Sequence, residues 1–134
     1  MSDNQDQKKS NAANHLMIFA DNSSSMGGQP FATLQKAMHN LSDMLFDDNG
    51  DSVAFDSIQT IYYNNSMESQ TTNTKDAFLR YIKNKHIQGI TDFVQCIDYI
   101  MEQVNVLAKE NQGLENNFSI IFLTDGCDTC NGED

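Results

Sequence analysis

The chain is short of basic residues and of long apolar runs. Its 134 residues include 8 Lys and Arg against 19 Asp and Glu, a formal net charge of −11. Binding to nucleic-acid phosphates and to anionic membrane surfaces relies on Lys and Arg, so this balance argues against both. The longest apolar stretches, such as residues 16–20 and 120–123, are far too short to cross a bilayer. Functions that rest on nucleic acid or lipid are therefore disfavoured.

Cysteine is also scarce. The three cysteines are odd in number and too sparse for a disulfide framework, so reduced thiols in a cytoplasmic or nuclear setting are the simpler interpretation. Residues 1–14 are polar and contain Lys8 and Lys9, but no apolar run follows, so they do not form a secretory signal. We expect a disordered polar tail over residues 1–14 and one intracellular domain over residues 15–134.

The rest of the chain alternates between strand-like and helix-like patterns. Residues 15–20 and 118–124 are apolar runs without polar alternation, which is typical of strands buried on both faces. Apolar residues spaced three and four apart predict helices over residues 31–45, from residue 74 or 75 to about 85, and over residues 93–108. The apolar stripe of the last helix comprises Phe93, Ile97, Ile100, Met101, Val104, Leu107 and Ala108.

The middle of the chain gives weaker signals. Residues 52–55 and 58–63 indicate two short strands, arranged as a hairpin around Asp56 and Ser57, and residues 64–73 indicate a polar loop. The order is then strand, helix, strand, strand, helix, helix, strand. This alternation predicts an α/β fold, a Rossmann-like doubly wound sheet with helices on both faces.

Two of the predicted strands end at an aspartate. Asp21 follows the first strand, with Ser23 and Ser25 close behind it, and Asp125 follows the last strand. Thr91 lies in a glycine-containing loop before a predicted helix. Ligands of open α/β sheets bind at the edge where such strands end. Carboxylates and hydroxyls without His or Cys form a hard oxygen site, which suits Mg²⁺, Mn²⁺ or Ca²⁺ rather than Zn²⁺.

These residues resemble a known motif. Asp21-x-Ser23-x-Ser25, then Thr91, then Asp125 before a glycine look like the metal-ion-dependent adhesion site (MIDAS) of von Willebrand factor type A (VWA) domains. The resemblance covers about residues 15–131, including the Met-Gly pair after the serines and the Leu-Thr-Asp-Gly end of the last strand. It implies a mostly parallel sheet with one antiparallel strand.

The resemblance also implies a function. In that family the two serines bind a divalent cation directly, so Ser23 and Ser25 are the expected direct ligands. Thr91, Asp21 and Asp125 are expected to bind it directly or through water. An acidic residue of a protein partner fills the remaining position. The implied role is divalent-cation-dependent protein–protein recognition, with Mg²⁺, Mn²⁺ or Ca²⁺ as a Lewis-acidic bridge and no catalysis.

Some features depart from the family pattern. Ser24 stands where glycine is usual, and it would be strained if that position required a positive φ. Gly89-Ile90 stands where two glycines are common. The chain also has no room after Asp125 for the last strands and helices of the family fold. We therefore expect a C-terminally truncated domain whose last strand is exposed and supports self-association.

Alternatives remain open at this stage. Asp21, Ser23 and Ser25 could serve only as helix caps, which would leave a metal-independent interaction or scaffold domain, or a non-functional fragment. A phosphoryl-transfer enzyme would need a second aspartate two residues after Asp21, where the chain has Ser23. Cys127 and Cys130 form a C-x-x-C pair, either a redox motif or two free thiols. The partner and pathway are not encoded in any visible motif.

Overall fold

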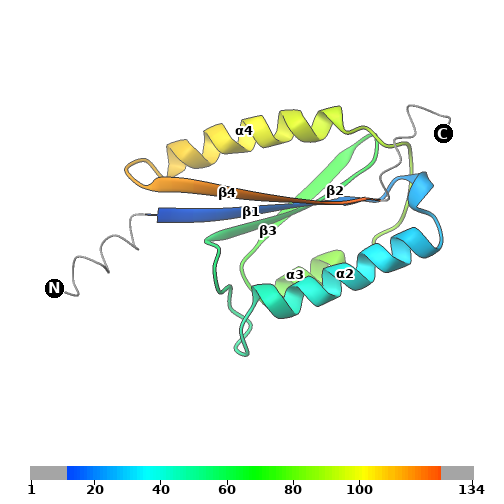
Figure 1. The fold of residues 1–134 in the computed structure, drawn as a ribbon, viewed down its shortest axis with the longest axis horizontal. Coiled ribbons are helices and arrows are strands. Elements are labelled where there is room, and N and C mark those ends of the chain that lie inside the picture. Colours follow the sequence, from blue (N-terminus) through cyan, green and yellow to red (C-terminus); the bar gives the residue numbers. More distant parts are fainter. Residues whose placement is uncertain (1–11, 125–134) are drawn as a thin grey trace.

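The computed structural model describes residues 12–124, in which a mixed sheet carries helices on both faces (Figure 1). The strands are β1 (Ala12–Asp21), β2 (Ser57–Tyr63), β3 (Met67–Thr72) and β4 (Glu115–Leu123), in the sheet order β3-β2-β1-β4. β1 pairs in parallel with β2 and β4, and β3 pairs antiparallel to β2. The predicted α/β fold with one antiparallel strand is confirmed.

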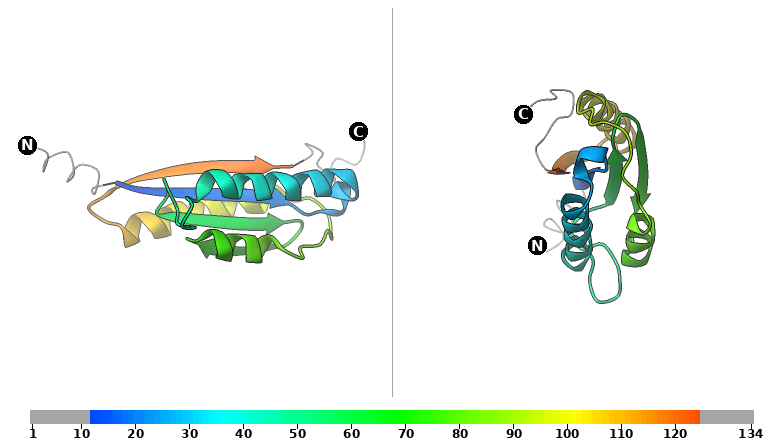
Figure 2. Two further views of the ribbon diagram at one scale, coloured as in Figure 1. Left: turned by 90° about the horizontal axis from the view of Figure 1, so that it is seen from below. Right: turned by 90° about the vertical axis from the view of Figure 1, so that its right-hand side faces the viewer.

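Helices cover the two faces of the sheet unequally. α2 (Gln29–Leu45) and α3 (Lys75–Ile82) lie on one face, and α4 (Val94–Glu110) lies on the other (Figures 1 and 2). A short 3-10 helix, η1 (Ser24–Met26), joins β1 to α2. The three predicted helices are thus present, with ends shifted by a few residues. None of the helices in the described range has the length and hydropathy of a membrane span.

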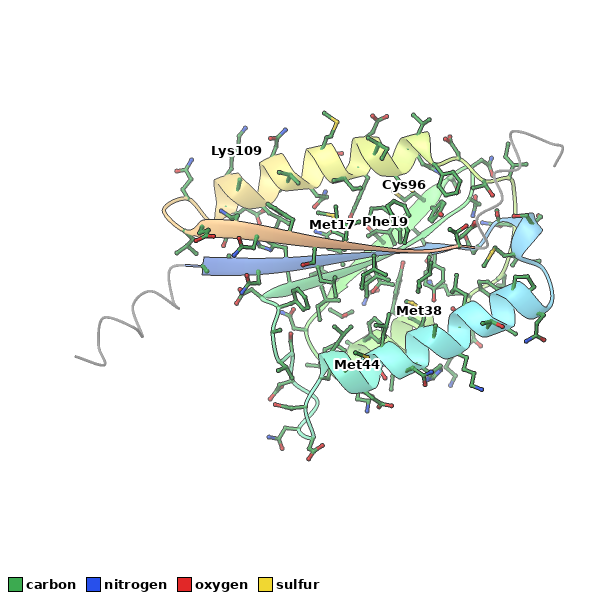
Figure 3. The ribbon with its side chains drawn as sticks, in the orientation of Figure 1. Met17, Phe19, Met38, Met44, Cys96 and Lys109 are labelled. Carbon is green, nitrogen blue, oxygen red and sulfur yellow. The ribbon has the colours of Figure 1, made fainter. Side chains whose placement is uncertain are left out.

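The core forms two layers, one on each side of β1. Met17 and Phe19 are fully buried and pack toward α4 together with Cys96, whereas Ile18 packs toward α2 together with Met38 (Figure 3). This split follows from the two-residue period of a strand, whose successive side chains point to opposite faces. Burying each such side chain stabilises the fold by about 1.5–3 kcal/mol, which explains why the central strand is an uninterrupted apolar run.

β1 begins earlier than predicted, at Ala12 rather than at residue 15. Hydrogen bonds extend it through polar residues, because Asn14 N donates to Asp56 Oδ2 at 2.7 Å and Asp56 N donates to Asn14 O at 2.7 Å. Asn117 Nδ2 also donates to Asn14 Oδ1 at 3.0 Å. The rest of the predicted tail, residues 1–11, lies outside the described residues.

One predicted strand is wrong. Residues 52–55 make an isolated bridge from Phe46 to Ser52 in place of a strand, and residues 67–72, predicted as a polar loop, form β3. β3 pairs with β2 from Tyr63 and Met67 onward. It is an edge strand with four exposed polar residues in its middle, so the apolar alternation on which the prediction relied is missing. The predicted order of strands and helices is still correct, because the two strands of the hairpin only lie later in the sequence than predicted.

The stripe predicted for the last helix is only partly buried. Cys96 is buried, and Phe93, Ile100 and Val104 pack against the same core layer. Ile97 and Met101 are instead 52% and 63% exposed, together with Val94 at 69%. These three residues lie on a flank of α4 that the described sheet does not cover.

Candidate metal centre

The end of β1 positions the first predicted ligands. Asp21 is the last residue of the strand and is fully buried. Its Oδ1 accepts hydrogen bonds from Ser23 N at 2.9 Å and from Ser23 Oγ at 2.6 Å, so the carboxylate turns the chain out of the sheet. Met26 N then donates to Ser23 O at 2.9 Å, which forms the turn of η1. The polar residues that terminate the apolar run therefore shape the loop that carries them.

The hydroxyls of Ser25 and Thr91 lie around the hydroxyl of Ser23. Ser23 Oγ lies 3.1 Å from Ser25 Oγ and 2.7 Å from Thr91 Oγ1, in addition to its bond to Asp21. Ser23 and Thr91 are fully buried, and Ser25 is partly exposed. Four of the five residues predicted from the sequence are thus brought together, although Thr91 is 68 residues away from Ser23.

The loop before α4 is held against the β1–α2 loop by backbone bonds. Ser24 N donates to Gly89 O at 2.9 Å, and Gln88 N donates to Asn22 O at 2.8 Å. Gly89 has a φ of +70°, and a Cβ built there would lie 2.0 Å from Asn65 Oδ1. A side chain at this position would be strained by the positive φ and would displace the Asn65 side chain, so glycine suits the loop that delivers Thr91 to the cluster.

Two asparagines that the sequence reasoning missed support the same loops. Asn64 Nδ2 donates to Asn22 Oδ1 at 3.0 Å, and Asn22 Nδ2 donates to His86 O at 2.9 Å. Both side chains are buried, and Asn22 N also donates to Tyr63 O at 3.0 Å at the end of β2. The chain is rich in asparagine throughout, so no signal in the sequence singles these two out.

The fifth predicted residue, Asp125, lies outside the described residues. Thr124, directly before it, donates through Oγ1 to Asp21 Oδ2 at 2.8 Å. The end of β4 therefore lies against the end of β1. Thr124 was not predicted as a site residue. Its hydroxyl directly before the aspartate at the end of a predicted strand could have indicated it.

The helix-cap alternative accounts for only part of the geometry. Ser23 is the residue before η1, but its hydroxyl accepts no capping hydrogen bond from the backbone of that helix and instead faces the cluster. Asp92, in contrast, accepts a hydrogen bond from Val94 N at 3.1 Å at the start of α4, as a capping residue does. Ser24 does not have a positive φ, so the strain considered for it is absent. Within residues 12–124, Asn84 is the one residue other than glycine with a positive φ.

The donor set fits a hard cation. Ligands at 2.0–2.1 Å in an octahedron around Mg²⁺ are separated by about 2.9 Å along each edge. The contacts of Ser23 Oγ with Ser25 Oγ and Thr91 Oγ1, at 3.1 and 2.7 Å, fall on either side of that spacing. No cluster of three His, Cys, Asp or Glu residues capable of holding a metal occurs within residues 12–124. The candidate site is therefore built mainly from hydroxyls, with Asp21 as its carboxylate in the described part.

Cys96 lies near this site but is poorly suited to take part in its chemistry. Burial, together with the smaller effect of the negative charges of Asp92 and Asp21, raises the pKa of its thiol to about 12. A thiol with that pKa stays protonated at neutral pH, and metal ligation or nucleophilic attack requires the thiolate. The redox alternative for Cys127 and Cys130 falls outside the described residues.

Comparison with known proteins identifies the fold family. The sequence model of the von Willebrand factor type A domain matches residues 15–134. The chain belongs to the VWA domain family. VWA domains are protein–protein interaction modules, so the family assignment supports an interaction role for this one. No curated protein sequence matches the chain.

A solved structure has a similar fold. Three N-terminal domains of the type V pili tip protein Mfa5 from Porphyromonas gingivalis match this VWA domain with a TM-score of 0.54 and 18% sequence identity. The match covers 81% of this chain and 19% of that chain. This VWA chain thus spans about a fifth of the solved chain that it matches, and an identity this low supports the fold alone.

Proposed function

We propose that this VWA domain binds a protein partner through a divalent cation. Ser23, Ser25 and Thr91 would hold the cation, with Asp21 and Asp125 in or just outside its coordination shell. The observation that carries the proposal is the convergence of three hydroxyls and one buried carboxylate at the carboxyl ends of two parallel strands. Oxygen donors of this kind favour Mg²⁺, with Mn²⁺ or Ca²⁺ as substitutes.

The charge of Asp21 supports the proposal. Its side chain is fully buried, and the ion pairs found within residues 12–124 do not include it. A buried carboxylate is unfavourable unless hydrogen bonds and a cation compensate it. Hydrogen bonds from Ser23 and Thr124 supply the first contribution, and a bound divalent cation would supply the second.

The cation would act as a Lewis acid toward an acidic residue of the partner. Ser25 is partly exposed, so the cluster is open toward solvent on its side, where a partner carboxylate could approach. Ser23, Thr91 and Asp21 are buried and would orient the cation from the protein side. Recognition of this kind breaks no bond, and we infer that the domain is not an enzyme.

A metal-independent interaction domain is the second candidate. The hydroxyl cluster satisfies its own hydrogen bonds, because the Ser23 hydroxyl donates to Asp21 and can accept from Ser25 or Thr91. Such a network is stable without a cation and could serve only to fix the loops. The two candidates predict different effects on metal affinity when the partly exposed hydroxyl of Ser25 is removed.

Calorimetric titration with Mn²⁺ separates them. Ser25→Ala removes one expected ligand whose hydrogen bond is to Ser23 alone, so the fold should persist. We expect Mn²⁺ affinity to fall about tenfold or more, since even loss of an indirect ligand contact has effects of that size. Ser69→Ala, which removes an exposed hydroxyl from β3, is the control and should leave the affinity unchanged. Equal affinities for parent and Ser25→Ala would support the metal-independent candidate.

We further propose that the domain works inside the cell, as the scarcity of cysteine predicts. The alternative is a surface location like that of a pilus tip protein, but the likeness to Mfa5 supports only the fold. Fractionation of cells expressing the tagged chain tests this proposal. Recovery from the cell surface or the medium would contradict it.

A further inference from the structure

The loop between α3 and α4, residues 83–93, carries Thr91 to the candidate metal centre. It passes across the end of the sheet beside η1 (Figure 1). Of its first eight residues, 83–90, seven are exposed, and Lys85 is the exception. Loops with little buried surface open at a low free-energy cost, so the contacts that hold this loop closed decide how often Thr91 is in place.

Backbone hydrogen bonds hold the middle of the loop. Ser24 N donates to Gly89 O at 2.9 Å, and Gln88 N donates to Asn22 O at 2.8 Å. Ser24, Gln88 and Gly89 are exposed, so water competes for these groups whenever the loop moves. The net contribution of such a hydrogen bond to stability is modest, because the open loop bonds to water instead. These two bonds alone are therefore a weak attachment.

Three side chains from three elements form a socket beside the start of the loop. Tyr62 of β2 and Glu68 of β3 are direct partners in the antiparallel pair, so their side chains point to the same face of the sheet. The ring of Tyr81 in α3 lies 6.1 Å from that of Tyr62, and its hydroxyl donates to Glu68 Oε2 at 3.2 Å. The Tyr62 hydroxyl donates to Gln35 Oε1 of α2 at 2.6 Å. We call Tyr62, Glu68 and Tyr81 the tyrosine socket.

Lys85 occupies the tyrosine socket. Its Nζ forms an ion pair with Glu68 Oε2 and lies 3.9 Å from the ring centroid of Tyr81 and 5.5 Å from that of Tyr62. Both ring distances are within the range of cation–π attraction, which strengthens as the cation loses water. The Lys85 side chain is only 15% exposed. One side chain therefore attaches the loop to β2, β3 and α3 together.

The residue before Lys85 directs it into the socket. α3 ends at Ile82, and Asn84 has a φ of +65°, a left-handed conformation that asparagine adopts more readily than most residues. The chain therefore reverses direction after the helix, and the side chain of Lys85 returns over Tyr81, four residues earlier. Local sequence and tertiary contact agree in this placement.

We propose that Lys85 is a positioning residue of the candidate metal centre, which keeps Thr91 beside Ser23 by holding the start of the loop in the tyrosine socket. Thr91 Oγ1 lies 2.7 Å from Ser23 Oγ, six residues after Lys85. Opening of the loop withdraws Thr91, and the apparent affinity for a cation then falls with the fraction of molecules whose loop is closed. The effect on cation affinity rests on the proposed function, whereas the effect on the loop does not.

The sign of the effect separates positioning from simple electrostatics. Removing the positive charge of Lys85 from a chain with a net charge of −11 would by itself strengthen cation binding. Positioning predicts weaker binding, because the loop opens. Lys75 supplies the matched comparison. Its Nζ pairs with Asp43 Oδ1 at 2.8 Å, so this ion pair joins α3 to α2 and does not involve the loop.

Amide hydrogen exchange, followed by NMR on the full chain without metal, tests the effect on the loop. In Lys85→Ala the amides of Ser24 and Gln88 should exchange about tenfold faster, while the amides of β1 keep their protection. Lys75→Ala should leave both loop amides unchanged. Unchanged exchange at Ser24 and Gln88 in Lys85→Ala would overturn the proposal, and so would an equal acceleration in β1, which would indicate a general loss of stability.

Glu68→Gln guards against a folding defect in Lys85→Ala. The Glu68 side chain is 54% exposed, so its replacement leaves no cavity. The same two amides should exchange faster than in the parent but slower than in Lys85→Ala, because Lys85 keeps both tyrosine rings. Exchange as slow as in the parent would contradict the role of the ion pair.

Calorimetric titration with Mn²⁺ tests the effect on the site. We expect the affinity of Lys85→Ala to be at least about threefold lower than that of the parent, a size typical of residues that act on a site from a distance. Lys75→Ala should bind Mn²⁺ as tightly as the parent or slightly more tightly. If the parent binds Mn²⁺ and Lys85→Ala binds it equally or more tightly, the positioning role is wrong. If the parent binds no Mn²⁺, the proposed function fails, and amide exchange alone decides whether Lys85 positions Thr91.

Discussion

Replacement of Asp21 by asparagine is the most informative perturbation of the candidate site. In the absence of metal it should change stability little. The Asp21 carboxylate accepts hydrogen bonds from Ser23 N, Ser23 Oγ and Thr124 Oγ1. Asparagine keeps an oxygen for Ser23, and its amide group can donate to the Thr124 hydroxyl, which can rotate to accept. With all hydrogen bonds retained, we expect a change of less than about 1 kcal/mol in the free energy of unfolding.

Mg²⁺ should raise the melting temperature of the parent chain more than that of Asp21→Asn. A ligand present at 100 times its dissociation constant stabilises the folded state by about 2.7 kcal/mol. For a domain of about 110 residues the entropy of unfolding is roughly 0.24 kcal/mol per degree, so this corresponds to an upward shift in melting temperature of about 10 °C. Asp21→Asn loses the negative charge that attracts the cation, and should shift by no more than about 2 °C at the same Mg²⁺ concentration.

The assay is thermal unfolding followed by circular dichroism, with and without MgCl₂ at constant ionic strength. Asp56→Asn is the matched control, because Asp56 is an exposed aspartate that also accepts a backbone hydrogen bond, from Asn14, in the region before β2. It should retain the full Mg²⁺-dependent shift. If Asp21→Asn responds to Mg²⁺ as strongly as the parent, the cation binds elsewhere and the proposed ligand set is wrong.

Two further predictions concern residues around the site. Gly89→Ala should lower the free energy of unfolding by about 1–3 kcal/mol in urea titrations, because of the positive φ and the close approach of Asn65 Oδ1. Gly113 has a φ of +90° but open space around it, so Gly113→Ala should lower the free energy of unfolding by less. Equal losses in the two variants would refute the steric argument. Cys96, whose burial raises the pKa of the thiol to about 12, should resist iodoacetamide at pH 8 in the folded protein and react on unfolding, as peptide mapping can show. Rapid labelling of native Cys96 would contradict the raised pKa.

The sequence predicts most of the fold because its strongest signals come from buried elements. The apolar run that forms β1 has helices on both sides and needs apolar residues at every position. The convergence of Asp21, Ser23 and Ser25 with Thr91 could also be predicted, since parallel strands end at one edge and loops gather there. The role of these residues as metal ligands stays a prediction.

The errors lie where tertiary context outweighs local pattern. β3 is polar because it is an edge strand, so nothing in its own residues distinguishes it from a loop. The stripe on α4 was predicted to face the core, but within residues 12–124 only the side of the helix that meets the described strands is buried. Asn22 and Asn64 connect two loops distant in sequence, a contact that exists only once the sheet has formed.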